Sequence, residues 1–203
     1  MNPFERLASG RARSAALITA LALALLFVLQ QVGIAVINGD LGTALVVIAL
    51  FDATMWIWVL AYAALIVDLP ADGRVVGTRW SVARAAATLA AIAPAALILS
   101  QLINSDVLAL IAYPIVLGAM GVSLLAVDLT TQQTGIVSGG VASIGLVTGI
   151  AFVAAAVGYG VGAYVESPLA TIGVSALLGG QILYVVWASW IGRRLRRAQS
   201  AES

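Results

Sequence analysis

The sequence predicts an all-α protein: a polytopic transmembrane bundle of six helices, arranged as three outward-facing hairpins with both termini in the cytoplasm. Of its 203 residues, 62% are hydrophobic and 9% are charged, whereas soluble domains carry about 25% charged residues. The chain also contains six apolar runs long enough to cross about 30 Å of hydrocarbon. The predicted spans are residues 14–37, 41–67, 81–102, 107–127, 137–165 and 168–191.

The breaks between these spans alternate in length. Residues 38–40, 103–106 and 166–167 form short breaks, whereas 68–80 and 128–136 are longer and polar. This alternation predicts three helical hairpins whose tight turns all lie on one side of the membrane.

The individual spans differ in their polar and helix-bending residues. The second span contains the one deep charge, Asp52, whereas the first, third, fourth and sixth contain no carboxylate. Pro94 in the third span and Pro114 in the fourth each remove a backbone hydrogen bond, so kinks are expected there. The fifth span is longer than a bilayer requires and should tilt or bend.

The arginines predict the orientation. All ten basic residues are arginines, and in this topology all lie on one side, whereas the opposite side has only Asp40, Asp106 and Glu166. The positive-inside rule places the arginine side in the cytoplasm. Residues 1–13 then form a cytoplasmic segment, 14–191 the transmembrane domain and 192–203 an arginine-rich cytoplasmic tail. The arginines are Arg6, Arg11, Arg13, Arg74, Arg79, Arg84, Arg193, Arg194, Arg196 and Arg197.

Aromatic residues near the span ends fit interfacial belts. Trp80, Trp187 and Trp190 fall near the cytoplasmic ends, and Tyr113 and Tyr164 near the outer ends.

The first apolar run has an alternative interpretation as a cleaved signal peptide, because arginines precede residues 15–29. The run continues through residues 32–37 without a clear small-x-small cleavage signal. Cleavage would leave five spans with the termini on opposite sides.

The chain contains no Cys and no His. This excludes thiolate and imidazole metal ligands and Ser-His or Cys-His nucleophile pairs. Asp52 and Asp128 lack the Gly-x-Gly-Asp pattern of intramembrane aspartyl proteases, and Asp128 is expected to be solvated at the cytoplasmic boundary. We therefore expect no enzymatic activity, no cofactor and no nucleic-acid partner.

Asp52 is the main candidate for a functional residue. It lies about 16 Å into the second span by helical rise, where an unpaired carboxylate costs about 2.5–3.5 kcal/mol. It should therefore face the bundle interior, together with Trp56 on the same side of the helix. Its expected neutral partners are Gln30 and Gln31 in the first span and, in the sixth, Gln181 or Tyr184.

Two interpretations of this group remain open. Asp52, Trp56 and the glutamines form a mid-membrane site that binds a cation, an amine or another small solute, or Asp52 joins the first, second and sixth helices by hydrogen bonds. No metal site is expected in either case.

Glycines are concentrated in the fifth span. Gly145 and Gly149 form one GxxxG pair, and Gly158 and Gly162 form another. Such pairs allow close approach of a second helix. That helix belongs to the same chain or, alternatively, to a partner in a homo- or hetero-oligomer.

The stretch GVASIGLVTGIAF at residues 140–152, with a final helix that reads YVVWASWIGRR at residues 184–194, resembles a group of uncharacterised six-helix bacterial membrane proteins. The resemblance covers about the C-terminal third. That group has a proline near the start of the fifth helix, which residues 130–138 lack. It implies the architecture and no particular activity.

These observations together predict an integral membrane protein embedded in the lipid bilayer of the cell membrane. We expect a non-enzymatic structural or accessory subunit. The alternative is a binding or transport protein for a small solute or cation, with its site around Asp52.

Overall fold

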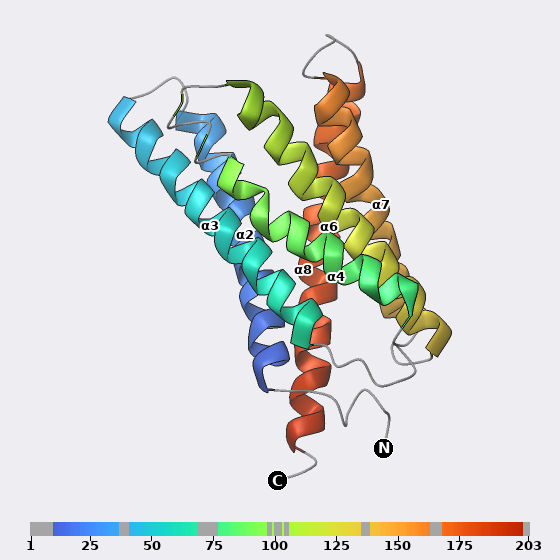
Figure 1. Ribbon diagram of the computed structural model, residues 1–203. Helices are drawn as coiled ribbons and strands as arrows, with labels where there is room; N and C mark the ends of the chain where they lie inside the picture. The colour runs from blue at the N-terminus through green and yellow to red at the C-terminus, as the bar shows by residue number, and fades with distance from the viewer. Residues whose placement is uncertain are drawn as a thin grey trace.

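The structure is a computed structural model that describes residues 10–36, 41–68, 77–96, 99, 103, 106–134, 139–162 and 168–200. In these ranges it has six long helices and no strand, so the predicted all-α six-helix class is confirmed (Figure 1). The helices are α2 (Gly10–Val36), α3 (Leu41–Asp68), α4 (Thr78–Ile92), α6 (Asp106–Thr134), α7 (Gly139–Gly162) and α8 (Pro168–Ser200).

Five of these helices are long and apolar enough to cross a membrane. Their apolar segments agree with the first, second, fourth, fifth and sixth predicted spans. The segments are Ala12–Gly33, Val46–Val67, Ile111–Gln132, Gly139–Gly162 and Pro168–Arg193.

Helix α4 is shorter than the predicted third span. It has 15 residues and ends at Ile92, one residue before a turn at Ala93. Ala93 still donates its N–H to the Leu89 carbonyl oxygen at 2.9 Å, but Pro94 has no N–H with which to continue the pattern. The helix therefore ends just before Pro94, where the sequence predicts a kink. Residues 97–98 and 100–102 of the predicted span lie outside the described residues.

The six described helices form a closed ring. The backbone of each lies beside two others, in the order α2, α3, α4, α6, α7, α8 and back to α2. The first and last helices are therefore neighbours, and Gly192 of α8 lies against Leu17 near the start of α2. The start of α2 and the end of α8 lie at the same end of the bundle (Figure 1).

The described arginines gather at that end. Arg13 lies in the first turn of α2 and Arg193 near the end of α8, next to Gly192. Arg79 and Arg84 lie in the first half of α4, on either side of Ala83. The Ala83 carbonyl oxygen is bonded through Ser123 to Tyr62, which lies in the last two turns of α3, toward the same end.

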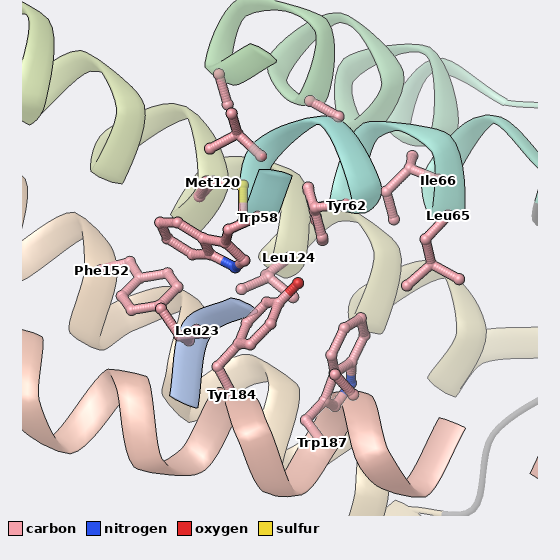
Figure 2. Packing of buried hydrophobic residues seen from close by; sticks show 14 of the residues in the cluster. Leu23, Trp58, Tyr62, Leu65, Ile66, Met120, Leu124, Phe152, Tyr184 and Trp187 are labelled. Atoms are coloured by element: carbon pink, nitrogen blue, oxygen red, sulfur yellow. The ribbon is translucent and has the colours of Figure 1, made fainter. Parts of the chain in front are cut away.

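Aromatic side chains from three helices fill the centre of the helix bundle (Figure 2). Trp58 of α3 meets Phe152 of α7 and Tyr184 of α8, each at a centroid distance of 5.8 Å. Phe152 and Tyr184 stack at 6.0 Å, and all three rings are buried. Each such pair contributes about 0.5–1.5 kcal/mol beyond burial, so the centre is packed with rings and not open at this level.

The outer surface of the bundle is apolar. Exposed leucine, isoleucine and valine side chains occur on every long helix, with Leu21 the most exposed at 72%. A soluble monomer rarely exposes apolar patches of this extent. The surface is therefore consistent with an integral membrane protein in contact with lipid.

Both GxxxG pairs of α7 are used inside the chain. A Cβ on Gly145 would overlap the Asp128 carboxyl of α6. A Cβ on Gly149 would lie 2.8 Å from Leu125, which also belongs to α6. On the opposite half of α7, Gly158 lies against Gly173 of α8. The prediction of tight packing within the fold agrees with these contacts, and oligomerisation through α7 stays a prediction.

The aromatic belt is only partly as expected. Trp190 is 40% exposed and can face lipid, whereas Trp80 and Trp187 are buried. Their indoles therefore serve packing inside the bundle rather than anchoring to the interface.

Candidate functional site

The structure distributes the five predicted site residues over three helices. Asp52 and Trp56 of α3 are partly buried, as is Gln30 of α2. Gln31 of α2 is exposed, and Gln181 of α8 is only 4% exposed.

Hydrogen bonds of Thr19 fix the heights of these side chains in the bundle. Thr19 lies level with Trp58 of α3 and with Tyr184 of α8. With antiparallel neighbours and 1.5 Å per residue, Asp52 lies within two turns of the height of Gln30. Gln181 lies about 12 Å nearer the arginine end than Gln30. By the same rise Gln181 lies about 5 Å from the height of Asp52, so Asp52 lies between the heights of the two glutamines.

A pocket of about 370 Å³ lies between α2 and α8. Gln181 lines it, but Asp52, Gln30, Gln31 and Trp56 do not. The amide oxygens of Gln30 and Gln181 are buried and have no hydrogen-bond partner among the described residues. The mid-membrane site around Asp52 stays a prediction.

Asp128 corrects the expectation of a solvated residue at the cytoplasmic boundary. It is only 1% exposed. Its Oδ1 accepts a hydrogen bond from Trp187 Nε1 of α8 at 3.2 Å, and its Oδ2 has no partner among the described side chains. Gly145 of α7 covers the carboxyl from the other side, so Asp128 lies where α6, α7 and α8 meet.

The burial of Asp128 follows from the true length of α6. The helix continues to Thr134, almost two turns beyond the predicted end of the span at residue 127. Two of its polar side chains bond within the helix: Thr130 donates to the Ala126 carbonyl oxygen at 2.7 Å, and Thr131 to that of Asp128 at 3.2 Å. Since these hydroxyls are satisfied locally, the polar turn can be buried.

One sequence signal could have revealed this arrangement. Between Asp128 and Gly135 the chain contains no proline or glycine that would end a helix. The Asp128 carboxylate alone predicts the end of the span. An acidic side chain can nevertheless be buried where a neighbouring helix has a small residue opposite it and another side chain donates a hydrogen bond. Gly145 and Trp187 supply these two features.

A first set of buried hydroxyls joins α2, α3 and α8. Thr19 donates to the Trp58 carbonyl oxygen at 3.3 Å, and its Oγ1 lies 2.6 Å from the Tyr184 hydroxyl. Because a threonine has one hydroxyl proton, Tyr184 is the donor in the second bond. One threonine therefore connects the first, second and last helices of the ring.

A second set joins α3, α4 and α6. Tyr62 donates its hydroxyl proton to Ser123 at 2.8 Å, and Ser123 donates to the Ala83 carbonyl oxygen at 2.8 Å. Interhelical bonds of this kind contribute about 0.6 kcal/mol on average and up to about 1.7. Both sets close the centre of the bundle around the aromatic rings.

The chemistry available in the described part of the chain is limited. No three acidic side chains gather there in a way that could hold a metal ion. The buried Asp128 carboxyl has one free acceptor oxygen, and the α2–α8 pocket has an almost wholly apolar lining.

No protein-family model, no curated protein and no solved structure matches the chain. The resemblance of the C-terminal third to uncharacterised six-helix bacterial membrane proteins therefore stays a prediction. The geometry defines a class, a bundle of apolar helices consistent with an integral membrane protein.

Proposed function

We propose that this chain is a non-enzymatic structural or accessory subunit of the cell membrane. The packed centre of the ring supports this proposal. Trp58, Phe152 and Tyr184 meet in the interior at ring-contact distances. A carrier needs a cavity between its helices for the transported solute, whereas these rings occupy that position.

The experiment uses the purified chain and native membranes. In proteoliposomes the chain alone should add no proton, sodium or potassium flux above that of empty vesicles. Extracted gently from its native membrane, it should co-purify with a second protein in a fixed molar ratio. Flux that depends on the chain, or a purely homomeric particle, would contradict the proposal.

We further propose that both termini are cytoplasmic. The gathering of Arg13, Arg79, Arg84 and Arg193 at one end of the bundle supports this orientation. Because the chain contains no cysteine, single cysteines can report it directly. In intact cells an impermeant maleimide should label Asp40→Cys and Glu166→Cys but not Ser203→Cys, and labelling of Ser203→Cys would reverse the assignment.

The alternative function, binding or transport of a small solute or cation, is favoured by one observation. The buried amide oxygens of Gln30 and Gln181 have no partner among the described residues. Replacement of Asp52 separates the two functions. A structural Asp52 predicts equal stability for Asp52→Asn and wild type and lower stability for Asp52→Leu. A binding site predicts that both variants lose proton- or cation-dependent binding.

Oligomeric contacts of α7 would have to use its outer face. The glycines of both GxxxG pairs face α6 and α8, whereas Val147, Ile150 and Val157 are exposed. These apolar side chains are the part of α7 available to a partner helix. Any such partner would therefore meet bulky side chains rather than bare backbone.

A further inference from the structure

The groove between α2 and α8 lies where the first and last helices close the ring. Its deeper part is formed by Leu23 and Gln181, which are buried, and its rim by Val28, Ile182 and Val186, which are about half exposed. Its volume of about 370 Å³ falls within the range of about 300–1,000 Å³ typical of ligand pockets. Since its rim is open and apolar, a bilayer would present hydrocarbon chains to it.

Two arginines lie on the same helix faces as this groove. Arg13 precedes Ala24 of the lining by eleven residues, which is close to three helical turns. Arg193 follows Val186 by seven residues, close to two turns. Each arginine is therefore nearly in line with the groove, at the same end of the bundle.

The spacing along the helices matches one leaflet of a bilayer. Arg13 lies about 22 Å from Val28 along α2, and Arg193 about 16 Å from Ile182 along α8. One leaflet has about 15 Å of hydrocarbon and about 5–7 Å of headgroup region. A lipid with its phosphate at the arginines would thus have the end of its acyl chain in the groove.

The local charge favours an anionic headgroup. Neither α2 nor α8 contains an aspartate or glutamate, so these helices contribute only positive charge beside the groove. Trp190, exposed on α8 between Val186 and Arg193, supplies the kind of side chain that prefers the headgroup level.

We propose that the seam of α2 and α8, which runs from Arg13 and Arg193 to the groove, is a binding site for one anionic phospholipid. Its phosphate lies between Arg13 and Arg193, and one acyl chain occupies the groove lined by Leu23, Phe27 and Val186. This inference requires the chain to lie in a bilayer but does not depend on the accessory role proposed above. It therefore stands if that role fails.

The first test is photocrosslinking in nanodiscs that contain phosphatidylglycerol with a diazirine at the end of one acyl chain. Crosslinks should be enriched at least fivefold on residues 23–28 and 181–186 over the equally exposed apolar face of α7 at residues 147–157. Crosslinks spread evenly over the exposed helix faces would overturn the proposal.

The second test measures lipid retention by native mass spectrometry. Wild type should retain phosphatidylglycerol in preference to phosphatidylcholine. Each of Arg13→Gln and Arg193→Gln should lower this preference about fivefold. The double replacement of Arg79 and Arg84 by Gln, on α4 away from the seam, is the matched control and should leave it unchanged.

Further outcomes distinguish the lipid from other ligands. Glycerol phosphate, which has the phosphate but no acyl chain, should not displace the lipid. Gln181→Leu should preserve retention, because the proposed occupant of the groove is apolar. Loss of the preference in the α4 control, displacement by glycerol phosphate, or loss of lipid in Gln181→Leu would each refute the site.

Discussion

Replacement of Gly145 by alanine tests the buried position of Asp128 most directly. A Cβ at residue 145 would overlap the carboxyl group of Asp128, which is bonded on its other side to Trp187 of α8. The carboxyl cannot move away without stretching that hydrogen bond. Gly145→Ala must therefore displace α7 from α6 or break the contact between α6 and α8.

The magnitude follows from three contributions. Overpacking of a well-packed site costs about 1–3 kcal/mol, and the loss of the Trp187 hydrogen bond costs about 0.5–1.5 kcal/mol. Alanine offsets up to about 1 kcal/mol because it is the better helix former. Together these ranges give a net loss of about 0.5–4.5 kcal/mol in the free energy of unfolding.

The assay is unfolding of the purified protein in mixed micelles with increasing denaturing detergent. The matched control is Gly140→Ala in the first turn of α7, where nothing lies within 4 Å of an added Cβ. This variant should be neutral or slightly stabilised. Equal effects of Gly145→Ala and Gly140→Ala would refute the packing described here.

A double-mutant cycle identifies the partner of Gly145. Asp128→Ala removes the overlapping carboxyl, so adding Gly145→Ala to it should cost at least about 1 kcal/mol less than in the wild-type background. Couplings of about 0.5–3 kcal/mol are usual for residues in contact. Additive costs would mean that the two residues do not touch.

Three further changes test the rest of the bundle by the same unfolding measurement. Gly158→Ala should cost more than Gly145→Ala, because its Cβ would meet the backbone of Gly173, which cannot rotate away; a neutral result would contradict the α7–α8 contact. Tyr184→Phe, which removes the bond to Thr19, should cost about 0.6–1.7 kcal/mol, and no loss would exclude that bond. Ser123→Ala removes two buried hydrogen bonds between three helices and should cost about 1–3 kcal/mol. A loss smaller than that of Tyr184→Phe would argue against these two bonds.

The fold class was predictable because the length and polarity of the apolar runs determine where helices can cross a bilayer. The sides of those helices were not. Leu21 is 72% exposed and Leu23 is fully buried, although both are leucines of one helix. In a membrane the solvent is as apolar as the core, so hydropathy contains little information on helix rotation.

The same limitation applies to the candidate site. The depth of Asp52 in its span could be estimated from the sequence, but the height of Gln181 relative to Gln30 depends on how α2 and α8 are aligned. Thr19 sets that alignment through Tyr184, and no pattern in either span indicates the pair. Asp128 differs for another reason, because a charge at the end of an apolar run predicts a boundary, whereas this carboxyl is buried inside α6.

The alternative of a cleaved first span can be weighed against the closed ring. Helix α2 supplies Leu23 to the core and Thr19 to the bonds that connect α3 and α8. Without α2 the ring would open between α3 and α8, and Tyr184 would lose its hydroxyl partner. A cleaved first span would therefore leave these contacts unmade, and the cleavage alternative stays a prediction.

Helix α8 completes contacts that the earlier helices cannot satisfy among themselves. Trp187 supplies the donor to Asp128, and Tyr184 supplies the donor to Thr19 and a ring to the central cluster. Until α8 packs, the carboxyl of Asp128 and the hydroxyl of Thr19 lack these donors in a surrounding where unpaired polar groups are costly. Helix α8 therefore closes the ring geometrically and completes its polar bonding, so the packing of α8 should be the step that commits the bundle to its final structure.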